Sequence, residues 1–365
     1  MPKKIIITVS NDVQYDQRIY RIAQCLHSAG YQITILGRKM QTTHDFSILP
    51  YKVVLFDIPF SKGFMMFALL NIRFFLYLLF HPADMLCAVD LDTILPSIFI
   101  KKIKKITLIY DAHELYPESP EIVSRPRMKR FWLKIEKYAF QNIDYCYTVS
   151  QGIADFFLKK YKYPCSVIRN MPELNTLPLA HDTSTPSYLL YQGALNMGRG
   201  LEKLIEAMQY IHNIPLYIAG SGDIEDDLKE LASLLKLEKR IHFMGKLTPD
   251  ELRQVTLGAH IGFNLLEDIG LSYYYSLANK FFDYVQCRVP QLCIDFPEYR
   301  HLNNEYEVAI LASNIDPKNI AENIQNLLDD KEHFKKLQIN CKRAAEVWNW
   351  EKESLKLIAI YASLS

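Results

Sequence analysis

The amino-acid sequence predicts an α/β protein with two doubly wound domains, each a parallel sheet covered by helices on both faces. Short apolar runs rich in β-branched residues alternate with longer segments of 3.6-residue periodicity along the whole chain. The alternation starts again after a proline-rich segment near the middle. At 365 residues, the chain is too long for one ordinary core and fits two domains of roughly 150–200 residues each.

The first half contains the strands of one expected sheet. Each apolar run is followed by a segment with helical periodicity, such as 17–29 or 128–141. Such βα alternation is typical of parallel sheets. The expected strands are KIIITVS, YQITILG, YKVVLFDI, ADMLCAV, ITLIYDAHE, DYCYTVS and CSVIRNM. The first of these runs is too short for a signal peptide and suits a buried strand.

The segment 64–80 (FMMFALLNIRFFLYLLF) is apolar along nearly its whole length. It lies at the short end of the roughly 17–25 residues that a spanning helix needs, and Arg73 at its middle would cost about 3 kcal/mol in a bilayer. We therefore expect a buried helix that covers the sheet, with contact of one face with the membrane surface as the alternative.

The second half repeats the pattern after residues 171–186, where three prolines and polar residues predict a linker. The expected domains are 1–175 and 186–349, with a C-terminal helix at about 350–365 packing back on the first. Helices are expected at 201–212, at 225–236, and after Thr248, which opens a capping box with Glu251. The expected strands are SYLLYQG, IPLYIAG, RIHFMG, IGFNLL and VPQLCID.

The net charge of +1 hides an asymmetry between the two halves. Residues 1–180 hold 23 Lys and Arg against 15 Asp and Glu, whereas residues 181–365 hold 19 against 26. The excess of 8 positive charges favours an anionic partner for the first half, either a phospholipid surface or a pyrophosphate-linked acceptor. Because the charges are dispersed, a solvated surface is an equal alternative, and we expect no nucleic-acid partner.

The seven cysteines are scattered, odd in number and without a CxxC pair. This usage predicts reduced core residues in a cytoplasmic protein, which could contact the inner face of the plasma membrane, and neither a disulfide framework nor a metal site. Asp90 and Asp92 have the spacing of a DxD metal motif, but we expect Asp92 to cap the helix that follows.

The loop in Tyr188–Gly200 (YLLYQGALNMGRG) is the first candidate site. An apolar strand enters a glycine-rich loop and a helix begins at Leu201, so backbone N–H groups are exposed at the positive end of a helix. Arg199 lies between Gly198 and Gly200 and adds a cation. The loop therefore predicts a phosphate site.

Residues Ser276–Val289 (SLANKFFDYVQCRV) form the second candidate site. Lys280 can neutralise a phosphate, and Asp283, one turn later on the expected helix, can accept both hydroxyls of a ribose. The simpler alternative is an ordinary ion pair between these two residues. Together with the glycine loop, the segment predicts a pocket for a sugar nucleotide.

The chain resembles the retaining glycosyltransferases of the GT-B fold, most of all family 4 and its bacterial members that build surface polysaccharides. The resemblance spans nearly the whole chain. It rests on the order of Tyr15-Asp16-Gln17-Arg18, Tyr110-Asp111-Ala112-His113-Glu114, Tyr147-Thr148-Val149-Ser150, the GALNMGRG loop, Gly220-Ser221-Gly222 and NKFFDY. It implies two Rossmann-like domains facing across a cleft and a nucleoside diphosphate sugar as donor.

By position, the resemblance implies that Arg199 contacts the donor diphosphate and that Asp283 holds the ribose. The family's E-x7-E motif is altered, because its first glutamate falls on Tyr275, and a second basic loop residue falls on Ala194. Lys280 then supplies the missing phosphate charge. The implied donor-binding residues are Gly193, Gly198, Gly222, Gly245, Ser276, Asn279 and Asp283.

On the acceptor side, the resemblance places His113 near the donor sugar and acceptor, where Glu114 and Glu118 could orient it. Asp16 and Arg18 match the acceptor loop, although an N-cap aspartate and a surface arginine explain them equally well. The acceptor is then a glycan or lipid-linked hydroxyl, and peripheral contact with an anionic membrane follows as a possibility from the charge of the first half.

The resemblance implies a metal-independent transfer with retention, in which His113, Arg199 and Lys280 are catalytic and no cofactor takes part. Two alternatives stay open: a GT-B UDP-sugar 2-epimerase, and a glycosyltransferase-like subunit without activity, which Tyr275 and Ala194 favour. A nicotinamide dehydrogenase fits worse, since the first strand–helix turn (VSNDVQYDQR) has no GxGxxG.

Overall fold

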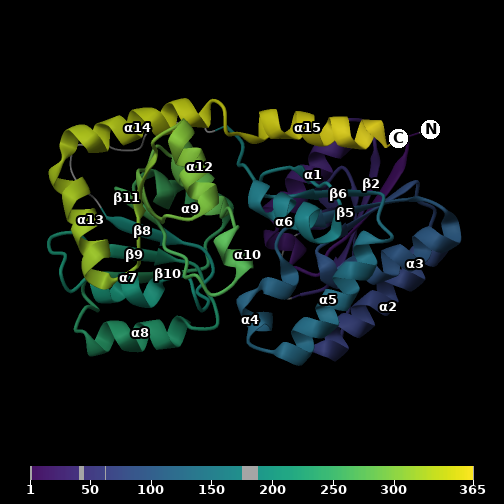
Figure 1. Cartoon of the computed structure of the whole chain (residues 1–365), viewed down its shortest axis with the longest axis horizontal. Helices are drawn as coiled ribbons and strands as arrows, with labels where there is room; N and C mark the ends of the chain where they lie inside the picture. The colour runs from purple at the N-terminus through teal and green to yellow at the C-terminus, as the bar shows by residue number, and fades with distance from the viewer. Residues whose placement is uncertain (1, 41–44, 62, 175–187, 365) are drawn as a thin grey trace. The chain divides into compact units, whose positions relative to one another are not determined.

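The structure is a computed structural model that describes residues 2–40, 45–61, 63–174 and 188–364. The chain divides into two compact units (Figure 1). Unit 1 is Met1–Arg169 with Glu353–Ser365, and unit 2 is Asn170–Lys352. Most of the linker predicted over 171–186 lies outside the described residues. The α/β fold class predicted from the sequence is confirmed, since each unit contains a parallel sheet with helices packed against it.

Unit 1 is built on a seven-stranded sheet in the order β3-β2-β1-β4-β5-β6-β7, and every neighbouring pair is parallel. Each strand expected in the first half is present. The chain adds strands outward from β1 on one side and then returns to add β4 on the other. The strands are β1 (Lys4–Thr8), β2 (Gln32–Arg38), β3 (Lys52–Phe56), β4 (Met85–Val89), β5 (Thr107–Ala112), β6 (Tyr145–Thr148) and β7 (Ser166–Val167).

The helices of unit 1 follow the strands that they connect. Asp16 is the N-cap of the first of them, where its carboxylate accepts a hydrogen bond from Ile19 N at 3.1 Å. The helices are α1 (Gln17–Ser28), α2 (Phe64–Phe80), α3 (Ile94–Lys104), α4 (Pro120–Val123), α5 (Pro126–Phe140) and α6 (Gln151–Tyr161), together with α15 (Trp350–Ser363) at the C-terminus. α15 packs on this unit, since Leu357 and Tyr361 are fully buried and Ser354 O lies 3.8 Å from Cys25 Sγ of α1.

Helix α2 corrects one expectation. Its bounds agree with the apolar segment 64–80, but it is buried along one face only. The residues that face the core recur every four positions, as helical geometry requires: Met66, Leu70, Phe74 and Leu78. The other face is apolar apart from Arg73 and lies in solvent, so the fully buried helix expected from composition is wrong.

Unit 2 is built on a six-stranded parallel sheet in the order β10-β9-β8-β11-β12-β13. Sequence analysis missed only the edge strand, which is a run of four residues and pairs with β12 alone. The strands are β8 (Leu189–Gln192), β9 (Leu216–Ala219), β10 (Ile241–Gly245), β11 (Ile261–Asn264), β12 (Gln291–Ile294) and β13 (Ala309–Ala312).

The helices of unit 2 are α7 (Leu201–Ala207), α8 (Glu225–Leu234), α9 (Pro249–Leu257), α10 (Leu271–Tyr274), α11 (Asn279–Gln286), α12 (Pro297–Glu305), α13 (Pro317–Asp329) and α14 (Lys331–Ala345). The capping box of α9 is present as expected, with reciprocal bonds between Thr248 and Glu251. α7 is shorter than the expected 201–212. The chain unwinds after Ala207, and the guanidinium of Arg240 binds the freed carbonyls of Met208 and Ile211.

The core of unit 2 follows the two-residue period of its central strand. Leu189 and Tyr191 pack in the cluster that contains α7 and α13, whereas Leu190 packs with Tyr284 of α11 on the opposite face. Both faces of β8 are therefore buried, and the positions left open to solvent are the loops at its carboxyl end.

Candidate active site

Glycine-containing loops gather at the carboxyl ends of β8, β9 and β10. Gly193 N donates to Ala219 O at 2.9 Å, and Gly220 N donates to Gly245 O at 2.8 Å. A side chain at Gly222 would collide with Leu195 O, so glycine lets the two loops touch. Because β8 and β11 lie where the strand order reverses, this edge is the topological switch point of the sheet, where open α/β folds bind ligands.

Arg199 lies in the loop between β8 and α7. Gly198 and Gly200 on either side have positive φ angles of 77° and 70°. The guanidinium stands over the Tyr273 ring at 4.9 Å from its centroid, and its Nε is buried with no hydrogen-bond partner in the described parts of the chain. Tyr273 therefore fixes the position of Arg199 without neutralising its charge.

Lys280 lies in the first turn of α11 and is only 7% exposed. Its Nζ stands 3.8 Å from the centroid of the Tyr191 ring. Burial, together with repulsion by Arg199, lowers the pKa of Lys280 well below its ordinary value. The described residues offer it no carboxylate at ion-pair distance, and it forms no ion pair with Asp283. The ion-pair alternative raised from the sequence is thus excluded.

The other residues expected around the donor lie on the same helix or just before it. Asp283 is half-buried and accepts a hydrogen bond from Gln192 Nε2 at 3.2 Å, at the end of β8. Ser276 Oγ donates to Tyr273 O at 2.8 Å, and Asn279 is exposed at the start of α11. Tyr275, at the position of the family's glutamate, is partly exposed at the end of α10.

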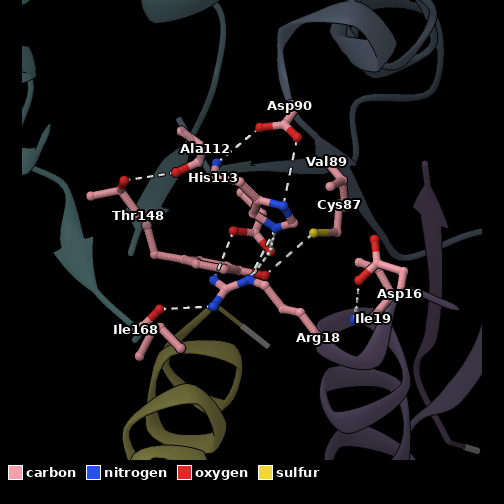
Figure 2. A network of polar contacts seen from close by, with 12 residues as sticks. Asp16, Arg18, Ile19, Cys87, Val89, Asp90, Ala112, His113, Thr148 and Ile168 are labelled. Atoms are coloured by element: carbon pink, nitrogen blue, oxygen red, sulfur yellow. Dashed lines mark hydrogen bonds and ion pairs between the residues drawn. The ribbon is translucent and has the colours of Figure 1, made fainter. Parts of the chain in front are cut away.

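In unit 1, the carboxyl ends of the strands contain a buried network of charges (Figure 2). Arg18 of α1 forms an ion pair with Asp111 of β5, with Nη2 2.9 Å from Oδ1, and donates from Nη1 to Ile168 O at 2.9 Å. Both side chains are buried, at 3% and 0% exposure. The surface arginine considered from the sequence is therefore wrong, because Arg18 is part of the interior of unit 1.

His113 lies between two carboxylates. Its Nε2 is 3.1 Å from Asp111 Oδ2, and its Nδ1 is 3.6 Å from Asp90 Oδ2. Burial alone would lower the pKa of His113, but the charges of Asp111 and Asp90 outweigh burial and raise it to about 9. The two carboxylates thus favour the charged form of His113, whereas Arg18 Nε, which lies 3.0 Å from Nε2, opposes it. Burial likewise opposes the charge of Asp111, but Arg18 and His113 hold the pKa of this carboxyl at about 2.

The neighbouring acidic residues have separate structural roles. Asp90 has a φ of 57° and accepts a hydrogen bond from His113 N at 2.9 Å, which fixes the backbone after β5. Asp92 does not cap the next helix, whose N-cap is Thr93. Its carboxylate instead accepts from Ser10 Oγ at 2.6 Å, across the switch point between β1 and β4. The capping role expected for Asp92 is wrong, since Asp92 lies inside the turn Leu91–Thr93 and the residue at the N-cap of α3 is Thr93.

The remaining acceptor-side residues lie near this network. Glu114 is partly exposed directly after His113. Glu118 is engaged elsewhere, in an ion pair with Lys129 at 2.7 Å. Sequence reasoning missed the aromatic rings under the two cations of unit 2. Tyr191 lies inside an apolar strand and Tyr273 follows no motif, so neither could be identified without the fold.

The arrangement in unit 2 can bind a polyanion. Arg199 and Lys280, which have no carboxylate partner within the described ranges, lie beside exposed loop backbone, and Asp283 is positioned one helical turn after Lys280. Such a set stabilises negative charge that develops on a leaving group. The network in unit 1 holds the imidazole of His113 in place, with Asp90 beside one ring nitrogen and Asp111 and Arg18 beside the other.

Two family models match the chain in sequence. Residues 16–174 match Glycosyltransferase Family 4, and residues 180–347 match Glycosyl transferases group 1. The chain belongs to the GT-B glycosyltransferases of the family 4 type. A curated relative, an uncharacterized glycosyltransferase of Methanocaldococcus jannaschii, is 37% identical over 76 residues. This match spans 20% of each protein, so it covers only one fifth of that relative's length.

Solved structures share the fold of this glycosyltransferase over nearly its whole length. Sucrose-phosphate synthase from Thermosynechococcus elongatus is 17% identical, with a TM-score of 0.84 over 99% of both chains. HepE of Anabaena, in complex with UDP and glucose, is 14% identical, with a TM-score of 0.79 over 99% of this chain and 100% of that one. At such identities the likeness shows the fold alone. In this glycosyltransferase, no described helix is long and apolar enough to cross a membrane.

Proposed function

We propose that this glycosyltransferase moves a sugar from a nucleoside diphosphate donor to a hydroxyl of a glycan or lipid-linked acceptor, with retention at the anomeric carbon, in cell-surface polysaccharide synthesis. The pair of cations in unit 2 is the observation that supports a nucleoside diphosphate sugar as the donor. Arg199 and Lys280 are both held over tyrosine rings and neither has a carboxylate partner among the residues that the structure describes. A diphosphate supplies the missing negative charge.

In the proposed reaction, the bond between the anomeric carbon and the diphosphate oxygen breaks, and a bond to the acceptor oxygen forms on the same face. The acceptor proton passes to an oxygen of the leaving phosphate, so no protein nucleophile takes part. Arg199 and Lys280 stabilise the departing diphosphate, which removes the need for a divalent metal. Asp283 binds the ribose hydroxyls, and His113 lies near the donor sugar and the acceptor by its position in the family's motif.

Uracil is the base that we favour for the donor, because HepE has the same fold and was solved with UDP and glucose. The acceptor-side residues are Asp16, Arg18 and Glu114 by position, with Arg18 acting through Asp111 and His113. Peripheral contact with an anionic membrane completes the proposal and brings the enzyme to a lipid-linked acceptor in the cytoplasm.

The test is a thermal-shift screen against UDP-, GDP-, ADP- and CMP-sugars in EDTA, since a ligand that binds only the folded state stabilises it. We expect a shift with one nucleotide that is lost in Arg199→Ala. Lys203→Ala is the matched control, because Lys203 lies on the adjoining helix and is paired with Glu206. No shift with any nucleotide sugar, or an equal shift in Arg199→Ala, would reject the site.

NMR of a donor incubated with the enzyme but without acceptor distinguishes an epimerase from a glycosyltransferase, because only an epimerase forms a new sugar nucleotide. A subunit without activity would bind nucleotide and transfer nothing to any acceptor. The alteration at Tyr275 is the feature that favours this last alternative. Turnover with retention, measured by the anomeric configuration of the product, would exclude both.

A further inference from the structure

One face of α2 is apolar and exposed to solvent. Opposite its buried face, this helix presents Phe64, Met65, Ile72, Leu76 and Phe80 to solvent, with Phe64 71% and Phe80 76% exposed. Arg73 is the only charged residue in the helix. Solvent-facing helix surfaces are normally polar, so a face of this kind marks an interaction site.

Helix α3 extends this apolar face. Phe99 and Ile103 are exposed on it, one turn apart. A groove of about 550 Å³ runs between the two helices, and its lining includes Ile72, Phe75, Phe99 and Ile103, with Lys102 at its end. We call the exposed apolar residues of α2 and α3 the apolar band.

Charge borders the apolar band on one side. The edge-on contact between Phe64 and Phe131, with ring centroids 6.3 Å apart, joins α2 to α5. Figure 1 shows α2, α3 and α5 together in unit 1. The exposed charged residues of α5 are all basic: Arg127, Arg130, Lys134 and Lys137. We call these four the basic row.

No acidic side chain offsets these charges on the three helices. α2 and α3 contain neither Asp nor Glu, and the only acid of α5, Glu136, is buried at 1% exposure and paired with Lys160 at 2.9 Å. The surface therefore combines exposed aliphatic and aromatic side chains with the basic row, whose four residues form no ion pair in the part of the chain that the structure describes. This combination matches the interface of an anionic bilayer, where acyl chains lie directly below phosphate groups.

We propose that the apolar band and the basic row form a docking surface for an anionic phospholipid bilayer. The band enters the boundary between headgroups and acyl chains, and the basic row binds the phosphates beside it. This proposal rests on the proposed function for its biological role, because it locates the membrane contact named there. Lipid binding itself is measured without sugar transfer.

The experiment is flotation of the purified protein with vesicles of phosphatidylcholine alone or mixed with phosphatidylglycerol. We expect binding to the anionic vesicles only, weakened by salt because the basic row acts through charge. Ile72→Gln/Leu76→Gln is expected to weaken binding at least about tenfold. Lys134→Gln/Lys137→Gln is expected to reduce both binding and its salt dependence.

Matched controls come from unit 2, where Leu234→Gln/Ile339→Gln removes equally exposed apolar residues and Lys331→Gln/Lys335→Gln removes exposed lysines of α14. Both should bind vesicles like the wild type. Equal binding by the band variant, or no binding by the wild type, overturns the proposal. So does a dimer in sedimentation that Ile72→Gln/Leu76→Gln dissolves, since a second copy would then cover the band. Vesicle binding without any nucleotide-dependent thermal shift would reject the proposed function and leave this surface standing.

Discussion

Lys280 places its ammonium 3.8 Å from the centroid of the Tyr191 ring, in a position that is 93% shielded from water, since the residue is 7% exposed. A ring face attracts a cation, but it does not replace the hydration that burial removes. The repulsion by Arg199 adds to this cost. Unit 2 therefore maintains an unfavourable charge that a bound anion would relieve.

Replacing this ammonium should separate stability from binding. Lys280→Met keeps the length of the side chain and removes the buried charge, so we expect an unchanged or higher melting temperature. Affinity for the donor should fall by about 2–4 kcal/mol, because the diphosphate loses a desolvated charge partner. Calorimetric titration with the nucleotide sugar measures the second effect. Lys203→Met serves as the control, and a lower melting temperature with normal affinity would contradict the assignment.

Binding of the donor should also take up a proton. The pKa of Lys280 is lowered in the free protein, and an adjacent diphosphate raises it again, so the complex holds more protons at intermediate pH. Affinity should then decrease as the pH rises from the lowered pKa toward the pKa in the complex. Titrations in buffers of different ionisation enthalpy give the number of protons taken up. Lys280→Met should abolish this uptake.

The ion pair between Arg18 and Asp111 should stabilise the folded protein mainly because each charge offsets the cost of burying the other. Arg18→Met removes the stronger of two charged partners and leaves the buried carboxylate of Asp111 with His113, so we expect a loss of about 3–5 kcal/mol in the free energy of unfolding. Arg18→Met/Asp111→Asn removes both charges and should recover most of this loss. Urea denaturation of the two variants provides the comparison. If the double variant were no more stable than the single one, the pair would not be the source of the effect.

Most of the fold follows from the sequence because the strands of a parallel sheet are buried on both faces. Such strands appear as continuous apolar runs, and β1 or β8 can be recognised without any partner. The strand β13 was missed because it lies at the edge of the sheet and its two central residues are only partly buried. The solvent exposure of one face of α2 was not predicted for another reason. Composition gives the amount of apolar surface on a helix but not how much of it the core covers.

The candidate site is predictable where local backbone geometry demands particular residues. Arg199 stands out because the glycines around it require positive φ angles, and Lys280 because it opens a helix at the edge of a sheet. The network around His113 is different. Arg18 and Asp111 are 93 positions apart in the sequence, and only the order of β1, β4 and β5 in the sheet brings their elements together.

His113 should make the stability of unit 1 depend on pH in the alkaline range. Its pKa rises from 6.5 to about 9 on folding, so its stabilising contribution is complete below pH 6.5 and is lost as the pH increases through 9. The loss is about 3 kcal/mol. Burial raises the pKa of Asp92 from 3.8 to about 7. The titration of Asp92 therefore changes the stability of unit 1 at lower pH than that of His113. Melting temperatures between pH 6.5 and 9.5 should therefore fall more steeply in the wild type than in His113→Gln.

Gly200 and Gly245 offer a matched test of the backbone at the donor edge. Both have positive φ, 70° and 67°, but a Cβ at Gly200 would lie 2.0 Å from Leu265 O, whereas a Cβ at Gly245 would meet nothing within 4 Å. Gly245→Ala should cost only the left-handed conformation of an alanine, about 1–2 kcal/mol. Gly200→Ala must in addition displace the loop that contains Arg199, so its melting temperature should fall further and its shift with the nucleotide sugar should be lost. Equal melting temperatures for the two variants would show that the loop moves freely, and the fixed position inferred for Arg199 would then be wrong.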